Sequence, residues 1–319
     1  MISYVIRRIL VLIPMLLIIT FLVFLGLELT PGDAVSYMVS PDALANISQE
    51  SLEQLRDSLG LNDPFIVRYF KWIGGILKGK FGYSLSSGVP ISEIISDRLP
   101  ATLELSITAL LISTFLGSIL GIISALKKGT IIDNILTLLG MLGVSIPRFF
   151  FGLVVILIFS LRLGWLPVGG RLLPGREAFL DTLPYLILPS LVLGLTMTAG
   201  VMRYARGSML DALNKEYIRT ARSKGLPEWR VKLIHGLRVA LSPIIVLIGF
   251  RLPMLIGGSV VIEQVFQWPG IGREFVAAVR FQNTPLVMMI ALLFVLVMLI
   301  ASFLIDLLIA MLDPRIRLE

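Results

Sequence analysis

Two apolar runs enclose a basic segment in the second half of this 319-residue chain. The runs read LPYLILPSLVLGLTMTAGVM at residues 183–202 and PIIVLIGFRLPMLIGGSVVIEQV at residues 243–265. Between them, residues 205–242 read ARGSMLDALNKEYIRTARSKGLPEWRVKLIHGLRVALS. Each run has the roughly 20 apolar residues that a membrane-spanning helix needs. The basic segment therefore lies in water, where the two spans leave the bilayer.

The sequence of the basic segment predicts a helix to which a soluble partner protein can bind. One face is apolar apart from its last member and repeats at three- and four-residue steps: Leu210, Leu213, Tyr217, Ala221 and Lys224. Gly225 and Pro227 end this helix, because glycine accepts the left-handed geometry of a helix C-terminus and proline cannot continue the hydrogen-bond ladder. We therefore expect a docking helix rather than a core helix.

The composition extends the membrane assignment to the whole chain. Hydrophobic residues make up 56% and charged residues 15%, with a mean hydropathy of +0.91, whereas soluble domains carry about 25% charged residues. The third span is interrupted by Pro147 and Arg148, which leaves a kinked or broken helix and one straight rod as alternatives. We expect an all-α integral membrane protein with six transmembrane helices, at Ile9–Leu29, Leu103–Leu126, Ile131–Leu163, Leu183–Met202, Pro243–Val265 and Pro285–Leu312.

Lys and Arg predict the orientation, because short cytoplasmic loops carry an excess of them. The first apolar run is too long for a signal peptide and reads as a retained anchor. With the N-terminus inside, the inner segments hold just over half of the 28 basic residues, nine of them between Arg203 and Arg238. Both termini and the docking helix are therefore expected in the cytoplasm. Anionic lipid of the inner leaflet accounts for the net charge of +7 without nucleic acid.

This topology divides the chain into four expected parts. The long outer loop is predicted to contain a surface helix from Ser48 to Leu59. The loop either packs on the outer face, covers a pore mouth or meets an external partner. The four parts are a cytoplasmic tail with the first helix at 1–30, an external loop at 31–100, a core of five transmembrane helices with the cytoplasmic loop 203–242 at 101–312, and a cytoplasmic tail at 313–319.

The residues predict no catalytic, cofactor-binding or metal-binding site. Gly74, Gly79 and Lys80 match a phosphate-cradling pattern, but Phe81 stands where a Ser or Thr must bind magnesium. The chain has no cysteine and a single histidine, His235, which excludes thiolate sites, histidine clusters and a Ser-His-Asp triad. Any ATP hydrolysis must therefore be done by another chain.

Charged residues in or beside the spans are candidates for a transport pathway, because charge in hydrocarbon is costly. Arg251, Glu263 and Arg148 are the residues that we expect to line it. Arg251 precedes Pro253 in a span that suits a broken helix around a charge. The alternative is a buried ion pair of Arg251 with Asp306 or Glu263. Glu28 and Glu104 lie near span ends and either reach water or line the pathway.

The second span carries a stripe of small residues at four-residue steps: Ser113, Gly117, Gly121 and Ala125. Such a stripe lets two helix backbones approach closely. Packing within the chain is favoured over packing across a dimer.

Several blocks together resemble the permease subunits of binding-protein-dependent ABC importers, specifically the first permease of dipeptide and oligopeptide systems. The resemblance extends over essentially the whole chain, and the ordered set is more specific than any one block. The blocks are VIRRILVLIPMLLIITFLVF at 5–24 with TPGD at 30–33, SIPRFFFGLVVILIF at 145–159, GWLPVGG at 164–170, EYIRTARSKGL at 216–226, VIEQVFQWPGIG at 261–272 and DLLIAMLDPRIR at 306–317.

The resemblance implies the type I importer permease architecture in a bacterial or archaeal cytoplasmic membrane. It implies a second permease subunit, two cytoplasmic P-loop ATPases that bind ATP and magnesium, and an extracytoplasmic binding protein. Where the family commonly shows an Arg-Asp pair before the proline of the last span, this chain has Gln282, Asn283 and Thr284. The coupling helix in the ATPase cleft would contain Glu216, Tyr217, Arg219, Thr220, Ala221, Lys224 and Gly225.

Relatives of this kind carry dipeptides, longer peptides, glutathione, nickel complexes or sugars, and peptide is the substrate that we expect. An ATP-independent secondary transporter is the alternative of another class, because charges within spans and broken helices would serve it equally well. The cytoplasmic docking helix argues against it. A membrane-embedded enzyme would need a nucleophile, a base or a metal site, and none is arranged in the sequence.

Overall fold

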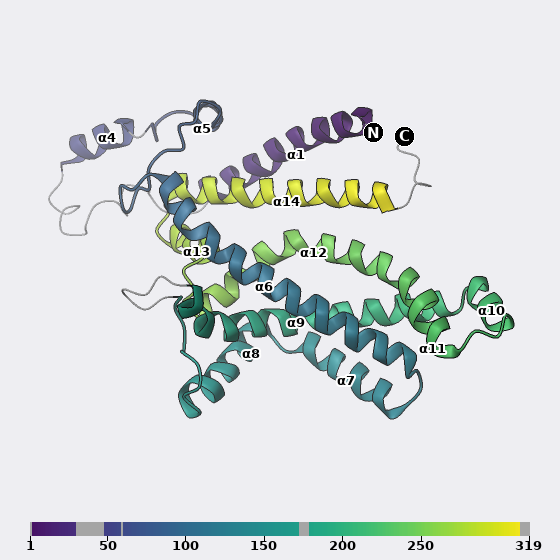
Figure 1. The fold of residues 1–319 in the computed structure, drawn as a ribbon. Helices are drawn as coiled ribbons and strands as arrows, with labels where there is room; N and C mark the ends of the chain where they lie inside the picture. The colour runs from purple at the N-terminus through teal and green to yellow at the C-terminus, as the bar shows by residue number, and fades with distance from the viewer. Residues whose placement is uncertain (1, 30–47, 59, 172–178, 313–319) are drawn as a thin grey trace. The chain divides into compact units, whose positions relative to one another are not determined.

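A computed structural model describes residues 2–29, 48–58, 60–171 and 179–312. These residues are helical almost throughout, with a single β-bridge between Tyr83 and Pro90 (Figure 1). The helices are α1 (Ile2–Glu28), α4 (Gln49–Ser58), α5 (Phe65–Leu77), α6 (Ile91–Leu126), α7 (Ile131–Ser145), α8 (Arg148–Val155), α9 (Phe179–Leu213), α10 (Glu216–Ser223), α11 (Glu228–Arg230), α12 (Leu237–Val265), α13 (Ile271–Arg280) and α14 (Thr284–Leu312), with π-helical segments η1 (Ile156–Arg162) and η2 (Val231–Gly236).

Within the described residues, five helices are long and apolar enough to cross a membrane, and a bent pair makes a sixth span if it is counted as one. The bent pair is α7 with α8 and η1, which meet at an angle of 102°. Proline causes the break, because Pro147 disfavours a helical conformation at Ile146, which is extended with φ −78° and ψ 125°. The all-α membrane class is thus confirmed, and the third span is broken rather than straight. The predicted surface helix is α4, as far as residue 58.

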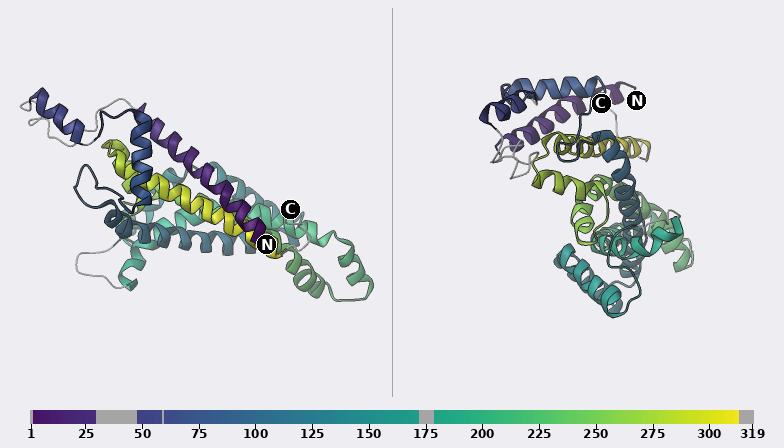
Figure 2. Two further views of the ribbon diagram at one scale, coloured as in Figure 1. Left: turned by 90° about the horizontal axis from the view of Figure 1, so that it is seen from above. Right: turned by 90° about the vertical axis from the view of Figure 1, so that its left-hand side faces the viewer.

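The chain forms two compact units. The first contains Met1–Pro100 and Gly270–Leu299, and the second contains Ala101–Pro269 and Ile300–Glu319. In the first unit, α1 runs alongside the first half of α14 (Figure 2), and Phe24, Tyr69 and Met288 are buried together.

Asn283 fixes the start of α14 within the first unit. Its side chain is 1% exposed, and its amide nitrogen donates to the hydroxyl of Ser84 at 2.8 Å. The amide oxygen accepts a hydrogen bond from the backbone N–H of Leu85 at 3.1 Å. The asparagine that departs from the resembled pattern therefore holds the turn before α14 to a loop almost 200 residues earlier.

The small-residue stripe of α6 packs against α9 within the second unit. A Cβ atom built on Gly121 would lie 2.4 Å from the carbonyl oxygen of Met202, and one on Gly117 would lie 2.5 Å from Cβ of Val201. Only glycine permits so close an approach of two helices. The interpretation of packing within the chain is confirmed.

The prediction of one continuous docking helix is wrong. Leu210 and Leu213 belong to the last turn of the long helix α9, where they pack against a buried cluster that includes Met209 and Ala240. The chain then leaves the helix at Asn214 and Lys215, whose backbone N–H groups bond to carbonyls only three residues back. Asparagine favours such turns. Leu210 and Leu213 are therefore apolar because the end of α9 is buried, and they do not share one surface face with the residues of α10.

Candidate functional site

The short helix α10 is the centre of the candidate site and begins directly after the turn that ends α9. It ends at Ser223, and Gly225 adopts a left-handed conformation with φ +74°. The N–H of Gly225 donates to the carbonyl of Arg222 at 2.9 Å, and the N–H of Leu226 to the carbonyl of Ala221 at 3.4 Å. Glycine is suited to this position because it has no Cβ to oppose the positive φ. The predicted helix end is confirmed.

One side of α10 packs on the loop that follows it. Ile218 is completely buried and Ala221 nearly so, in contact with Val231 and partly buried Leu226. Tyr217, which was expected on the apolar face, is 39% exposed, and its hydroxyl donates to the carbonyl of Ala212 at 3.3 Å. Because α10 starts as a new helix at Glu216, its buried face contains Ile218 instead of the expected Tyr217. Ile218 is therefore the anchor that the periodicity missed.

The opposite side of α10 is open. Six of the seven expected coupling residues have exposed side chains or backbone, whereas Ala221 is buried beneath the helix. Glu216 and Arg219 form a 3.2 Å ion pair in which both side chains are largely exposed. Contact of these exposed residues with a partner protein stays a prediction. The six exposed residues are Glu216, Tyr217, Arg219, Thr220, Lys224 and Gly225.

Ion pairs connect α10 to the base of the next span. Arg222 Nε lies 2.7 Å from Glu228 Oε1, and Lys232 Nζ lies 3.5 Å from Glu228 Oε2. Glu228 opens α11, and α11 continues through η2 into α12. π-helical segments frequently occur at functional sites. α10 is thus joined to the segment that leads into α12 by both packing and charge. Sequence reasoning missed Glu228, because its spacing to Arg222 matches no helical face.

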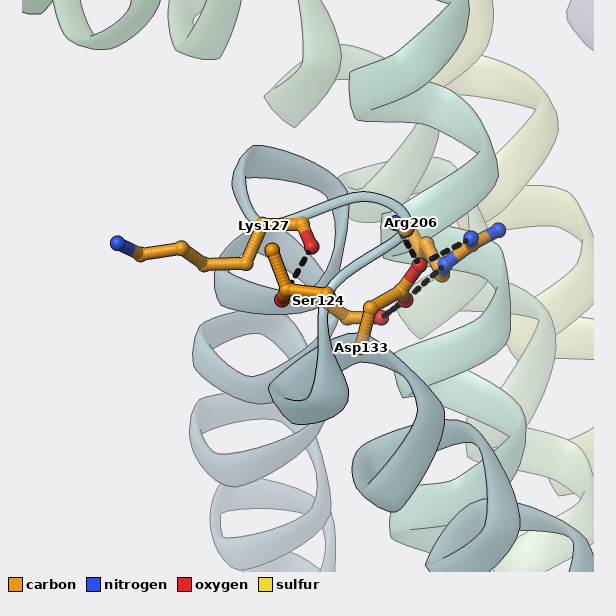
Figure 3. Close-up of polar contacts among 6 residues, drawn as sticks. Ser124, Lys127, Asp133 and Arg206 are labelled. Carbon is orange, nitrogen blue, oxygen red and sulfur yellow. Dashed lines mark hydrogen bonds and ion pairs between the residues drawn. The ribbon is translucent and has the colours of Figure 1, made fainter.

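A buried ion pair holds the C-terminal part of α9, the helix that precedes α10 (Figure 3). Arg206 donates from Nε and Nη2 to the two carboxylate oxygens of Asp133 at 2.9 Å each. Ser124 of α6 donates to the same carboxylate at 2.5 Å, and the backbone N–H of Gly129 donates at 3.0 Å. The C-terminal end of α6, the N-terminal end of α7 and the C-terminal part of α9 thus meet at Asp133, which is 4% exposed. The sequence carries no local signal for a pair 73 residues apart.

Arg251 and Arg148 lie in the second unit at the level of the spans. Arg251 is half-buried, and its Nη1 donates to the carbonyl of Met197 at 2.9 Å. Arg148 is exposed at the start of α8. The described side-chain bond of Arg251 thus goes to backbone, and its pairing with Glu263 or Asp306 stays a prediction. The side chain of Asp306 lies outside the described residues.

Glu263 is buried at 0% exposure near the end of α12. Its Oε1 accepts hydrogen bonds from the hydroxyls of Thr102 at 2.8 Å and Ser259 at 3.0 Å. The Thr102 bond ties α12 to α6, whereas the Ser259 bond lies within α12. The acidic residues near span ends, Glu104 and Glu28, instead form ion pairs with Arg171 and Arg68, respectively.

Two of the blocks that carry the family resemblance meet beside Glu263. The N–H of Gly170 donates to the carbonyl of Phe266 at 2.9 Å. A Cβ atom on Gly169 would lie 2.2 Å from that same oxygen, so only glycine fits there. The indole of Trp268 is fully buried and donates to the carbonyl of Ala101 at 2.8 Å.

Two family models match the chain. The binding-protein-dependent transport system inner membrane component matches residues 117–318, and the N-terminal model of the same transport systems matches residues 1–106. The chain belongs to the inner-membrane permease family of binding-protein-dependent ABC transporters. This permease is a multi-pass membrane subunit and not the ATPase. Membership implies ATPase and binding-protein partners.

Similar permeases have been described in bacteria. The oligopeptide transport system permease protein AppB of Bacillus subtilis is 42% identical over 99% of this chain and 100% of the relative. The glutathione transport system permease protein GsiC of Salmonella paratyphi A is 38% identical over 99% of each chain. A chain of the MetNI methionine ABC transporter matches with a TM-score of 0.54 at 17% identity, over 70% of this chain and 98% of that chain. That likeness supports the fold.

Proposed function

We propose that this permease forms half of the transmembrane pathway of an ATP-driven importer for di- and oligopeptides. An external binding protein delivers the peptide, and a second homologous permease forms the other half of the pathway. Two cytoplasmic P-loop ATPases bind ATP and magnesium and supply the energy. The observation that carries the proposal is α10, a separate helix with an open face, an anchored back and a charged connection to α12.

In this proposal, α10 sits in a cleft of one ATPase and transmits its movement. Closure of the ATPase pair pushes α10 against Val231 through Ile218, and the Arg222–Glu228 ion pair makes α11 follow. α12 continues from this loop and carries Arg251 into the membrane. Rigid-body movement of such a bundle alternates access between the two sides. Both termini and the 203–242 loop are then cytoplasmic, and residues 31–100 are external.

Peptide is the favoured substrate because the relatives that span the whole chain are named for oligopeptide and glutathione transport. Glutathione is the second candidate and is itself a small peptide derivative with free carboxylates. Nickel complexes and oligosaccharides have no supporting observation among the described residues, which hold no cluster of three metal-ligating His, Cys, Asp or Glu.

The test is a proline substitution in the turn that ends α10. Gly225→Pro removes an N–H that bonds to Arg222 and places proline at φ +74°, which its ring forbids. We expect peptide-stimulated ATP turnover of the reconstituted importer to fall to the basal rate while the subunits still assemble.

The matched control is Gly79→Pro, which has the same left-handed φ and also loses one N–H bond, to Ile76, but lies outside the coupling loop. It should leave stimulated turnover near the unmodified rate. Undiminished turnover in the Gly225→Pro importer would count against the coupling role.

A further inference from the structure

Helix α5 of the first unit is apolar on both of its sides. On the packed side, Tyr69 is 4% exposed and Trp72 is partly buried in the cluster that contains Phe24. A helix that is apolar all round is normally covered on every side, by protein or by lipid. The outer side of α5 therefore needs a cover of its own. Its exposed apolar residues are Ile66, Val67, Phe70 and Leu77.

Contacts with α1 place α5 beside the apolar length of a span. α1 is apolar enough to cross a membrane up to Glu28. The ring of Phe65 lies 5.5 Å from the ring of Phe21 and 5.0 Å from that of Phe24, measured between ring centroids. Since a helix rises about 1.5 Å per residue, Phe21 and Phe24 lie about 10 and about 6 Å along α1 before Glu28. α5 thus packs on α1 before that span reaches its charged end.

Tyr69 and Arg68 fix α5 along this part of α1. The hydroxyl of Tyr69 donates to the carbonyl of Leu17 at 2.8 Å and lies 3.0 Å from the hydroxyl of Thr20. Arg68 forms an ion pair with Glu28. α5 crosses α1 rather than running parallel to it, because Figure 1 shows α5 end-on and α1 from the side. A helix that packs across the side of a span, within its apolar length, lies in the bilayer itself.

Lysines border the outer side of α5. Lys71, Lys78 and Lys80 are exposed and line a groove of about 600 Å³ whose floor contains Phe70 and Gly74. Lys71 also pairs with Asp63 at 2.6 Å. Lysine is depleted in interfaces between proteins. At a membrane surface, by contrast, its alkyl stem covers apolar surface while its ammonium group reaches the headgroups. The lysine border therefore favours lipid over a protein partner.

We propose that α5 is embedded in the leaflet at the C-terminal end of α1, with its outer side against lipid acyl chains. Lys78 and Lys80 lie at the level of the headgroups and bind their phosphates. The depth agrees with the roughly 5–10 Å to which amphipathic helices enter the boundary between headgroups and acyl chains. The assignment of this leaflet to the outer side rests on the proposed function. Part of the loop proposed to be external is then anchored in the membrane.

Spin labels at single cysteines test this placement, because the chain has no cysteine of its own. Phe70→Cys carries a nitroxide in the assembled importer, in vesicles of phosphatidylcholine and phosphatidylglycerol. Its collisions are measured with oxygen, which concentrates among acyl chains, and with a nickel chelate, which stays in water. We expect collisions with oxygen to exceed those with the chelate several-fold. Ile66→Cys, one turn earlier on the same side, should give the same result.

Gln54→Cys, exposed on the polar helix α4, is the matched control, and its label should collide mainly with the nickel chelate. The ratio at Lys80→Cys should lie between those at positions 54 and 70, because headgroups separate water from acyl chains. An excess of chelate collisions at position 70 would mean that α5 lies in water, and few collisions with either reagent would mean that protein covers it. Either result overturns the proposal.

Peptide uptake by the unlabelled importer in the same vesicles separates the proposal from the proposed function. If binding protein and ATP produce no accumulation of peptide, the proposed function fails. The collision ratios report where α5 lies whether or not peptide moves, so the placement in the leaflet is judged by those ratios alone.

Discussion

At the scale of single residues, Asp133 joins α6, α7 and α9 within the second unit. Its carboxylate accepts four hydrogen bonds, from Ser124, the Gly129 backbone and two nitrogens of Arg206. Among the described residues, Asp133 is the acid that forms an ion pair with Arg206, whose side chain is 29% exposed. The proposed coupling helix α10 begins ten residues after Arg206, at Glu216.

Removing the charge of Asp133 should therefore destabilise the protein. Breaking a buried pair typically costs about 3–5 kcal/mol, because the remaining charge loses its partner. We expect Asp133→Asn to lower the thermal unfolding midpoint of the purified complex strongly. Asp211→Asn is the control, since Asp211 is exposed near the same end of α9, and its midpoint should stay close to that of the unmodified protein. Equal midpoints for both variants would contradict the structural role of Asp133.

At the scale of elements, the close crossing of α6 and α9 provides the rigid support for α10. The crossing depends on Gly117 and Gly121, and its four-residue spacing is visible in the sequence because it lies within one helix. The turn at Asn214 was not predictable in the same way. It depends on the burial of the last turn of α9 against Met209 and Ala240, which are brought together only by folding.

A methyl group at the crossing should separate the two helices. In Gly121→Ala, the new Cβ would meet the backbone of Met202 and Arg206, which cannot rotate away as a side chain can. Overpacking of this kind costs about 1–3 kcal/mol, which denaturant or thermal unfolding in detergent measures. Gly207→Ala on α9 meets nothing within 4 Å and should be neutral or slightly stabilising. A neutral Gly121→Ala would show that the helices do not approach closely.

At the scale of the whole molecule, the spans and their order follow from apolar length, so the membrane class was accessible from the sequence. Pro147 marked where the third span could break, but the sequence left a straight helix as an alternative. The contacts that tie the spans together were not accessible. Arg206 contacts Asp133 across 73 residues of sequence, and Asn283 contacts Ser84 across 199 residues. Hydrophobic periodicity carries no information about contacts at such sequence separations. The partner of Arg251 was likewise not predictable from the sequence. In the structure its guanidinium donates to the backbone carbonyl of Met197.

The central claim is that the open face of α10 docks on a cytoplasmic ATPase, and single-site photocrosslinking tests it most directly. The chain has no cysteine, so Thr220→Cys on this face can be labelled alone with maleimide-benzophenone. Ser87→Cys, exposed in the segment expected outside, is the control. On illumination of the assembled importer, we predict that the label at position 220 crosslinks to the ATPase subunit and the label at position 87 does not. Absence of an ATPase adduct at position 220, or equal adducts at both positions, would contradict the claim.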